Sequence, residues 1–531
     1  MTTSTLPTHD LKKIAEHIAD AIEKGHITNK HELLTYKKEL TRRYALSAIP
    51  SDSELFACIE GARRTDTVKT FLQRKVVRTL SGVAVVAVMT SPHPCPHGRC
   101  VPCPGGPPHT PQSYTGREPA ALRAARHGFD AFRQVEDRLR QLEAIGHPTD
   151  KIDLIVMGGT VPARDMEYQR FFVRRCYDAL NGMPSPSLEG AQQLNEQAAH
   201  RCTGLTIETR PDWCRMQHID AMLSLGTTRI ELGAQILDDT VLALMKRGHT
   251  VSDTILATRL AKDAGFKICY HVMPGLPGSS FENDLQSFQH MFRDERFRPD
   301  MIKIYPTLVI ESSLLYREWK EGRYAPLEVE EAVELIAEMK RYIPEWVRVQ
   351  RIERDIPSNM IEGGITKSNL RQLVHARMKE RGLSCRCIRC REAGHLSRIQ
   401  HMVVKDDFEL RKREYLASGG REVFVSMENE DAIVAYCRLR IPSRPHRHEM
   451  EDAAVVRELR VHGSMVEIGK REKGAWQHRG YGRALMRQAE DISLRFGKEK
   501  ILVLSGVGTR EYYRKIGYVR EGPYMAKTLA E

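Results

Sequence analysis

The sequence predicts an α/β chain in which an incomplete parallel β/α barrel precedes a smaller α+β domain, with a helical region in front of both. Two observations indicate this arrangement. Six short apolar runs between residues 82 and 306 each end in a glycine or a polar break, and helical stretches separate them. From about residue 399 the chain changes to alternating strands with one helix, which is typical of a separate α+β domain.

Residues 1–80 are the predicted helical region. The segment LKKIAEHIADAIEKG, residues 11–25, spaces its apolar residues at the helical period, and Thr8 and Asp10 are capping candidates in front of it. No catalytic motif occurs in this region. We therefore expect it to bind a partner rather than to carry chemistry.

The barrel is predicted over residues 81–345. Its strands correspond to the apolar runs at residues 82–89, 151–159, 203–211, 228–235, 267–275 and 300–306. The catalytic residues of β/α barrels lie on the loops that follow the strands. The loop after the first run is therefore an expected place for chemistry.

Residues 346–398 are predicted to form a basic linker that carries the motif CRCIRC. Residues 399–531 are predicted to form the α+β domain. Its strands are expected in EVFVSM, AIVAYCRLRI and AAVVRELRV, followed by a helix from Gly480 and a last strand in KILVLSG.

Composition narrows the class of protein. The chain has 531 residues, of which 41% are hydrophobic, so it can bury more than one core. No apolar run approaches the roughly 20 residues needed to cross a bilayer, and the N-terminus does not resemble a secretion signal. Twelve cysteines, mostly in two clusters, then favour metal chemistry over disulfides. We expect a cytoplasmic protein without membrane contact.

The formal net charge of +12 is unevenly distributed. Residues 338–421 contain 19 Lys and Arg against 11 Asp and Glu, which gives this stretch a net charge of +8. A solvated basic face is one explanation. Because the excess is concentrated in one region, a polyanionic partner is the other, and nucleic acid is the first candidate.

Three thiols lie close together in SPHPCPHGRCVPCPGG, residues 91–106: Cys95, Cys100 and Cys103. A 4Fe–4S cluster takes one thiolate for each iron, so three cysteines leave one iron open. S-adenosylmethionine can bind such an iron and be cleaved by an electron from the cluster. A zinc site completed by His93 or His97 is the alternative. Placement after the first barrel strand favours the cluster.

Dense motifs accompany this loop: CPHGRCVPCPGG, QSYTGREP (112–119), IETRPDWC (207–214), MPGLPG (273–278) and GVGTREYYRKIGY (506–518). From about residue 78 to the end, the chain resembles the catalytic subunit of Elongator, a tRNA wobble-uridine acetyltransferase with a radical S-adenosylmethionine barrel and a GNAT acetyltransferase domain. In this sequence four residues separate Cys95 from Cys100 and two separate Cys100 from Cys103. Many radical enzymes have gaps of three and two residues instead. This changes the loop length but not the number of ligands.

The resemblance implies roles for barrel residues. The turn of Gly158, Gly159 and Thr160 would contact the methionine part of S-adenosylmethionine, and Glu208 and Gln235 would be polar groups on the cofactor side. Ordinary hydrogen bonding at strand ends is the alternative for Glu208 and Gln235. Lys151 lies at the start of its strand, away from the cluster, but the family implies that it contacts acetyl-CoA.

The C-terminal domain carries a second motif. Gln477-His478-Arg479-Gly480-Tyr481-Gly482 fits the pyrophosphate loop of GNAT enzymes, in which glycines and a helix N-terminus bind phosphate. A plain turn before a helix is the alternative. The resemblance implies that acetyl-CoA contacts residues from two elements and a tyrosine pair: Glu458, Leu459, Arg460, Val461, Gln477, Gly480, Tyr481, Gly482, Arg483, Ala484 and Tyr513, with Tyr512 and Tyr513 near the thioester. A phenol there could act as an acid toward the leaving thiolate.

The second cysteine cluster, Cys385, Cys387 and Cys390, is most similar to a structural zinc site, which His395 could complete. A second iron–sulfur cluster is the alternative, but no barrel loop frames these cysteines. The role expected for the site is stability.

Together, a radical generator and an acetyl-CoA site imply that a 5′-deoxyadenosyl radical activates the acetyl methyl group for addition to C5 of the wobble uridine. Hydrolysis of the thioester would leave 5-carboxymethyluridine. The basic linker and the N-terminal helices would bind the tRNA phosphates. Two alternatives stay open, a protein lysine acetyltransferase with a structural iron–sulfur barrel and a tRNA-binding scaffold. The sequence does not decide whether accessory subunits or a homodimer are needed.

Overall fold

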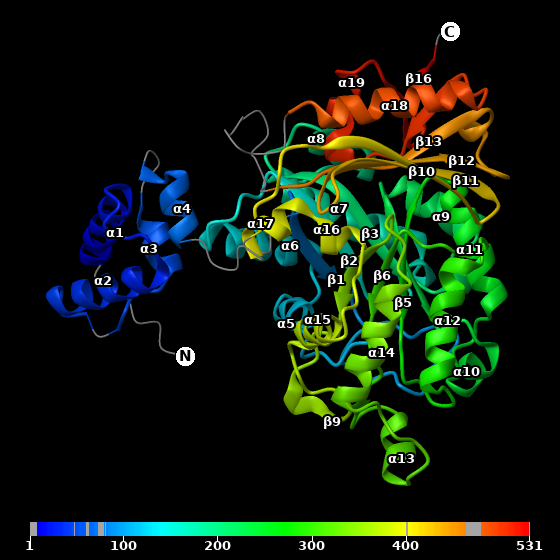
Figure 1. The fold of residues 1–531 in the computed structure, drawn as a ribbon, viewed down its shortest axis with the longest axis horizontal. Coiled ribbons are helices and arrows are strands. Elements are labelled where there is room, and N and C mark those ends of the chain that lie inside the picture. Colours follow the sequence, from blue (N-terminus) through cyan, green and yellow to red (C-terminus); the bar gives the residue numbers. More distant parts are fainter. Residues whose placement is uncertain are drawn as a thin grey trace.

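The structure, a computed structural model, describes residues 8–46, 48–59, 63–72, 79, 81–399, 402–463 and 479–529. Figure 1 shows a small helical lobe beside a large body, with the C-terminal domain above the barrel. The lobe consists of α1 (Thr8–Glu23), α2 (Lys30–Arg43), α3 (Asp52–Cys58) and α4 (Asp66–Leu72). No helix in the described ranges is long and apolar enough to cross a membrane.

The helical lobe has a core of its own. The apolar residues at helical spacing in α1, including Ile14 and Ile18, are fully buried against Leu33, Leu40 and Leu55 of the neighbouring helices. The lobe meets the body where α3 packs on α6 (Ala131–Ala144). The predicted helical N-terminal region is therefore confirmed.

The barrel is a sheet of seven parallel strands in the order β1-β2-β3-β4-β5-β6-β8. Their bounds are β1 (Ala84–Met89), β2 (Lys151–Met157), β3 (Arg201–Thr209), β4 (Arg229–Gln235), β5 (Lys267–Val272), β6 (Met301–Ile304) and β8 (Arg348–Ile352). The two edge strands, β1 and β8, do not pair with each other in this sheet. The predicted incomplete parallel barrel is confirmed.

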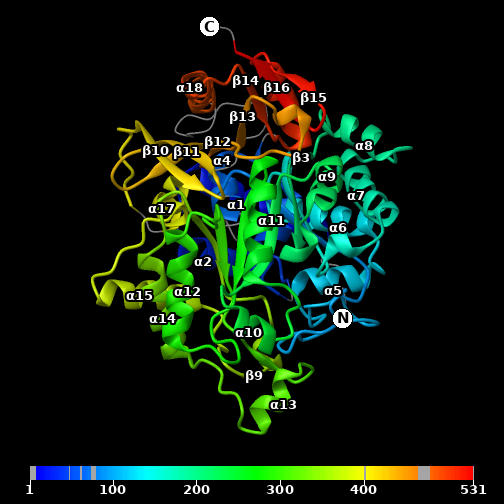
Figure 2. The ribbon, with the colours of Figure 1, turned by 90° about the vertical axis from the view of Figure 1, so that its right-hand side faces the viewer.

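Helices cover the outer face of this sheet (Figure 2). They include α5 (Pro119–Arg126), α7 (Met166–Asn181), α8 (Leu188–Asn195), α9 (Met216–Ser224), α11 (Val251–Asp263), α12 (Phe281–Arg293) and α14 (Val329–Arg341). Two further helices, α10 (Asp239–Leu244) and α13 (Leu315–Lys320), lie below the sheet in this view. On β2, Ile152, Leu154 and Val156 are fully buried and belong to the main apolar core. The alternate residues of β2 are partly exposed, because successive side chains of a strand point to opposite faces.

Residues 346–398 contain regular structure that the sequence interpretation did not foresee. They include the seventh barrel strand β8, the short strand β9 (Ile361–Gly363), which pairs with β7 (Val309–Ile310), and the helices α15 (Leu370–Glu380), α16 (Ile388–Arg391) and most of α17 (Ala393–Ile399). The sequence RVQRI of β8 has too many polar residues for a typical buried strand. It forms a strand because it pairs with β6.

The C-terminal domain is a twisted sheet in the order β10-β11-β12-β13-β14-β16-β15, with α18 packed on it. Its elements are β10 (Glu409–Ala417), β11 (Gly420–Glu428), β12 (Ile433–Ile441), β13 (Ala453–Val461), α18 (Tyr481–Arg495), β14 (Lys500–Val503), α19 (Arg510–Arg514), β15 (Val519–Glu521) and β16 (Tyr524–Thr528). The predicted α+β domain is confirmed.

Buried ion pairs join this domain to the barrel. Arg457 on β13 donates from both terminal nitrogens to the two carboxylate oxygens of Asp300, each at 2.6 Å. Arg440 on β12 donates at 2.6 Å to Asp263 at the end of α11. All four side chains are at most 1% exposed. The two domains therefore share one closed, charged interface.

The interface also depends on two glycines. A Cβ atom at Gly506 would lie 2.2 Å from the carbonyl oxygen of Thr203, and one at Gly508 would lie 2.5 Å from the side chain of Arg201. The loop after β14 therefore contacts the backbone of β3 directly. Residues with side chains could not approach so closely.

Candidate functional site

The first candidate site lies at the carboxyl ends of the barrel strands. A pocket of about 500 Å³ is lined there by the three cysteines of the first loop and by strand-end residues, among them Gly159, Thr160, Glu208 and Gln235. The family resemblance predicts these residues on the cofactor side of the barrel, where loops after the strands carry the catalytic residues. The structure brings them into one pocket.

The three cysteines of this loop are spread apart. Cys95 Sγ lies 3.5 Å from Thr160 Oγ1, Cys100 Sγ lies 3.0 Å from His97 Nε2, and Gln112 donates to Cys103 Sγ at 3.5 Å. Burial raises the pKa of Cys95. The structure describes every residue of this loop, and nowhere in the loop do three possible ligand atoms lie within 4.8 Å of one another.

This spread distinguishes two kinds of metal group. A tetrahedral zinc ion with bonds of about 2.3 Å would hold its sulfurs about 3.8 Å apart. The cysteines of the first loop, even with His97 nearby, do not form so tight a group. A larger iron–sulfur cluster with three thiolate ligands fits this donor set better than a single zinc ion does.

The turn after β2 is shaped by its glycines. Gly158 and Gly159 have φ values of +147° and +83°, which favour glycine. A Cβ atom at Gly158 would lie 2.0 Å from Thr90 Oγ1, and one at Gly159 would lie 3.7 Å from Cys95 Sγ. The turn therefore leaves the backbone directly against the cysteine loop, where it can approach a ligand.

Glu208 and Gln235 both face this pocket. Tyr114, which is buried, donates its hydroxyl proton to Glu208 Oε2 at 2.5 Å. Burial raises the pKa of Tyr114 well above its ordinary value, so the phenol stays protonated and can donate. Gln235 has a φ of +69°, an uncommon conformation for a residue other than glycine. The sequence analysis quoted Tyr114 within QSYTGREP but assigned it no role.

The second candidate site lies between the C-terminal domain and the opposite end of the barrel. This pocket has a volume of about 1,020 Å³. Its walls come from the start of the barrel strands, from β13 and from the N-terminus of α18, and they include Lys151, Arg201, Thr203, Glu458, Leu459, Arg460, Val461, Gly480, Tyr481, Gly482, Arg483, Tyr512 and Tyr513. Ala484 does not line it, and Gln477 lies outside the described residues.

The start of α18 has the features of a phosphate-binding helix N-terminus. Gly480 caps the helix with a φ of +91° and has no side chain that could cap the first turn. Helix α18 has 15 residues, so the N–H groups of its first turn and its dipole favour an anion. Arg483 lines the same pocket and adds positive charge, whereas Arg479, which also lines it, pairs with Asp406 at 2.7 Å. This end of the pocket can therefore bind a pyrophosphate.

The two tyrosines differ in their surroundings. Tyr513 is 6% exposed and packs edge-on against Tyr518 in the domain core, whereas Tyr512 is 36% exposed. Burial raises the pKa of both phenols, so both are protonated at neutral pH. Since both line the pocket, either can donate a proton to a group bound there.

The barrel end of this pocket explains the position of Lys151. This lysine lies at the first position of β2, far from the cysteine loop, but the C-terminal domain covers that end of the barrel. Burial lowers its pKa. Lys267, at the start of β5, lines the same wall, and burial lowers its pKa to about 8. Sequence reasoning missed Lys267, Arg201 and Thr203, because only the docking of the two domains makes them part of a pocket.

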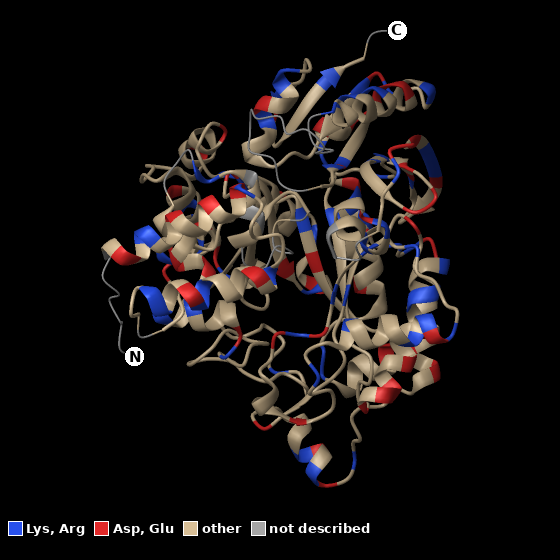
Figure 3. Ribbon diagram, turned by 60° about the vertical axis from the view of Figure 1, so that its left-hand side comes forward, with Lys and Arg blue, Asp and Glu red and all other residues tan. Residues whose placement is uncertain are grey.

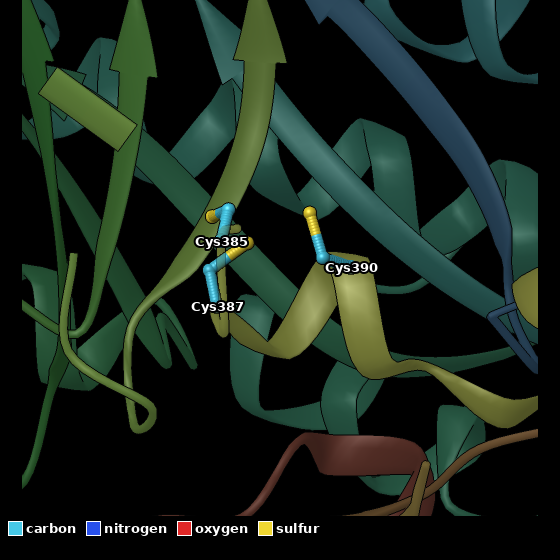
Figure 4. A group of neighbouring side chains, drawn as sticks. All are labelled: Cys385, Cys387 and Cys390. Carbon is cyan, nitrogen blue, oxygen red and sulfur yellow. The ribbon is translucent and has the colours of Figure 1, made fainter. Parts of the chain in front are cut away.

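The second cysteine cluster is compact. The sulfurs of Cys385, Cys387 and Cys390 lie within 4.8 Å of one another (Figure 4). Hydrogen bonds from Cys385 and Cys390 hold the pKa of Cys387 well below its ordinary value. Lys340 donates to Cys390 Sγ at 3.6 Å. The spacing suits three ligands of one metal ion.

His395 stays the predicted fourth ligand, although among the described residues no histidine belongs to this group of close ligand atoms. Another histidine, His375, is influenced electrostatically by Cys387, and its buried Nε2 has no hydrogen-bond partner. Burial lowers the pKa of His375 to about 4, so its ring is neutral and able to bind metal.

Many of the arginines between residues 338 and 421 form ion pairs with glutamates of the same chain. Arg348 pairs with Glu392, Arg391 with Glu428, and Arg413 with both Glu345 and Glu428. Arg377 and Arg381 pair with glutamates of α14. In Figure 3, basic and acidic segments lie close together over much of the molecule. These ion pairs offset part of the positive charge of this stretch, and its net excess of +8 remains.

Comparison with known proteins accounts for both sites. Sequence profiles match the chain in four consecutive parts: the ELP3 N-terminal domain at residues 11–80, the Radical SAM superfamily at 92–289, the Radical_SAM C-terminal domain at 299–380 and the Acetyltransferase (GNAT) family at 394–518. The "tRNA uridine(34) acetyltransferase" of Methanocaldococcus jannaschii is 49% identical over 530 residues, 98% of each chain. The chain belongs to the Elongator complex protein 3 family.

Two further members of the Elongator complex protein 3 family are similar to this chain over most of its length. The human "Elongator complex protein 3" is 43% identical, over 94% of this chain and 93% of its own. The solved structure titled "The archaeal Methanocaldococcus infernus Elp3 with N-terminus deletion (1-46)" is 48% identical and superposes with a TM-score of 0.76, covering 85% of this chain and all of that one. The chain therefore combines a radical SAM barrel with a GNAT-type acetyltransferase domain.

Proposed function

We propose that this protein modifies tRNA at the wobble uridine, using S-adenosylmethionine and acetyl-CoA to install a carboxymethyl group at C5 of the base. The observation that carries the proposal is the presence of both pockets on one barrel, one at each end. An acetyltransferase acting on a protein lysine would need only the pocket at α18. The name of two Methanocaldococcus relatives, "tRNA uridine(34) acetyltransferase", supports the substrate.

At the first pocket, Cys95, Cys100 and Cys103 would hold a 4Fe–4S cluster and leave one iron for S-adenosylmethionine. When bound, this pair supplies a 5′-deoxyadenosyl radical that can take hydrogen from an acetyl methyl group. The chain's own contribution is positioning. The turn of Gly158 and Gly159 lets backbone approach the ligand, and Tyr114 fixes the orientation of Glu208.

At the second pocket, the N-terminus of α18 would bind the pyrophosphate of acetyl-CoA. Strand β13 would run along the pantetheine arm, with Lys151 on the opposite wall. Tyr512 or Tyr513, both neutral, would donate a hydrogen bond to the thioester carbonyl or a proton to the leaving thiolate. The thioester must be hydrolysed to leave a carboxymethyl group.

The test is mass spectrometry of nucleosides from tRNA incubated with the protein, a reductant, S-adenosylmethionine and acetyl-CoA. We expect 5-carboxymethyluridine, and its formation should require both co-substrates. Acetylated lysine on added protein substrates without any change in tRNA would instead identify the lysine acetyltransferase. Unmodified tRNA with the purified single chain, but modified tRNA after addition of a partner, would indicate the scaffold alternative.

Replacing Gly480 by valine should weaken acetyl-CoA binding about tenfold or more. Holding a β-branched residue at the φ of +91° that the loop requires costs about 1–3 kcal/mol. A loss of 1.4 kcal/mol in binding free energy lowers the affinity tenfold. Gly480→Asn is the matched control, since asparagine tolerates this conformation better. Titration calorimetry with acetyl-CoA measures the effect, and tRNA affinity should hardly change. An equal loss of both affinities would show that the domain had misfolded.

The compact cluster of Cys385, Cys387 and Cys390 is proposed to hold a structural zinc ion. Replacing the three cysteines by serine should release zinc and lower the free energy of unfolding by a few kcal/mol. Metal analysis of protein purified without chelators, together with thermal unfolding, measures both effects. Wild-type protein that contains no zinc would contradict the assignment. Loss of zinc in His375→Ala but not in His395→Ala would identify the fourth ligand.

A further inference from the structure

The far ends of the two pockets are separated by about the length of the barrel. Lys151 lines the pocket at α18, and Gly159 lines the pocket at the cysteine loop. At about 3.3 Å per residue, these ends of β2 are roughly 25 Å apart. Reacting atoms must approach to about 3–3.5 Å. An acetyl group that stays beside α18 is therefore out of reach of chemistry at the cysteine loop.

The interior of the barrel nearly connects the two pockets. On β2, Asp153 lines one pocket and Ile155 lines the other; on β4, the same holds for Arg229 and Glu231. The two residues of each pair lie two positions apart on the same face of one strand, which is a distance of about 6.6 Å. The wall between the pockets is therefore one layer of side chains.

This layer is polar and incompletely bonded. Arg229 donates to Asp153 at 3.2 Å, and its Nε lies 3.5 Å from Glu231 Oε1 without forming a hydrogen bond. The other oxygen of Glu231 is bonded to His271 at 2.9 Å and to Lys303. Arg229 is 5% exposed and Glu231 is fully buried. A buried ion pair, Arg229 Nε with Glu231 Oε1, that makes no hydrogen bond therefore lies at the point where the pockets meet.

Most barrels of this kind fill their interior with apolar side chains, so a charged layer requires an explanation. Buried polar groups without partners cost free energy, and they are retained where a ligand or a conformational change satisfies them. The acyl end of acetyl-CoA has a carbonyl oxygen that Arg229 Nε could bind. Cys269 is a small, fully buried side chain of the same layer, and its Sγ lies within 4.8 Å of the ligand atoms of Glu231 and His271.

We propose that the barrel lumen is the passage through which the acyl end of acetyl-CoA, still joined as a thioester, crosses between Arg229 and Glu231 to reach the pocket of the cysteine loop. The inference rests on the proposed function, because it concerns how the two co-substrates meet. The pyrophosphate stays at the N-terminus of α18, and the pantetheine arm extends into the lumen.

The passage can be obstructed at a residue that lines neither pocket. Cys269→Met adds bulk to the lumen at the dividing layer, and Ile268→Met, on the outer, helix-facing side of the same strand, is the matched control. Cys269→Leu is a second obstruction, in case Cys269→Met does not fold. Three quantities are measured for each variant: acetyl-CoA affinity, reductive cleavage of S-adenosylmethionine without acetyl-CoA, and deuterium transfer from methyl-deuterated acetyl-CoA into 5′-deoxyadenosine in the presence of tRNA.

We expect the lumen variants to keep acetyl-CoA affinity and cleavage of S-adenosylmethionine while deuterium transfer falls about 100-fold, as for a misplacement of about 1 Å between reacting groups. Ile268→Met should keep all three. Deuterium transfer at the wild-type rate in folded lumen variants would overturn the passage. If wild-type protein transfers no deuterium during modification of tRNA, the proposed function fails instead.

A second probe separates a carried thioester from free acetate. Methyl-deuterated acetate, supplied together with coenzyme A in place of acetyl-CoA, should transfer no deuterium into 5′-deoxyadenosine. Transfer from acetate as fast as from acetyl-CoA would mean that free acetate crosses, which contradicts the proposal.

Discussion

Replacing Cys95, Cys100 and Cys103 together by serine should abolish both the EPR signal of a reduced 4Fe–4S cluster and the cleavage of S-adenosylmethionine. The three thiols line one pocket and are too widely spread for a single zinc ion. Serine cannot replace the thiolates that hold an iron–sulfur cluster. Because the other pocket lies at the opposite end of the barrel, acetyl-CoA affinity should stay at the wild-type value.

The measurement uses anaerobically reconstituted protein, with iron content, EPR after reduction and chromatography of 5′-deoxyadenosine. The triple serine variant at Cys385, Cys387 and Cys390 is the control, since it removes the same number of thiols elsewhere. It should keep the reduced-cluster signal. A signal that survives in the first variant and disappears in the second would reverse the two assignments.

Replacing Asp300 by alanine should lower the free energy of unfolding by about 3–5 kcal/mol, which is typical when one partner of a buried ion pair is removed. Asp300 accepts both hydrogen bonds from Arg457, and neither side chain is exposed. The variant leaves the guanidinium of Arg457 with Glu422 as its remaining carboxylate partner. Urea unfolding measures the loss.

The double variant Asp300→Leu/Arg457→Met is the informative control. Replacing both charges by apolar groups should cost less than removing Asp300 alone, because one charge of each sign is removed and no excess positive charge stays buried. A double variant as unstable as Asp300→Ala would mean that lost packing, not the excess positive charge, causes the destabilisation.

The same pair predicts a pH dependence. Burial alone would raise the pKa of Asp300, but Arg457 and Lys262 lower it well below its ordinary value. A carboxylate whose pKa is depressed by folding stabilises the native state above its unfolded pKa of about 3.9. This contribution is lost as the pH falls below that value. Wild-type stability should therefore decrease more steeply in acid than that of Asp300→Ala.

The sequence predicted the parts of the fold that local patterns determine. Apolar strands that end in glycine, such as β2 with Gly158 and Gly159, identified the barrel and one rim of its pocket, because strand ends of parallel sheets converge. The strand β8 was not predicted, since Arg348 and Arg351 interrupt its apolar pattern. Arg348 is accommodated by Glu392, which lies 44 residues further along the chain.

The second site could be predicted only in part. The glycines before α18 and the tyrosine pair carry a local signature, but the opposite wall depends on which end of the barrel the domain covers. Thr203 and Arg201 gave no signal, because their role arises from the close approach of Gly506 and Gly508. The basic excess was visible in the sequence, whereas the glutamates that offset part of it, such as Glu428 and Glu345, became evident only in three dimensions.

The direct contact of Gly506 and Gly508 with β3 has a consequence for inhibitor design. Acetyltransferases of the GNAT type share the helix N-terminus that binds pyrophosphate, so compounds that mimic this part of coenzyme A would inhibit many of them. Here the far wall of the 1,020 Å³ pocket is supplied by the barrel, through Arg201, Thr203 and Lys267. A compound that spans both walls would distinguish this protein from acetyltransferases without a barrel, and excising the acetyltransferase domain for screening would remove the selective half of the target.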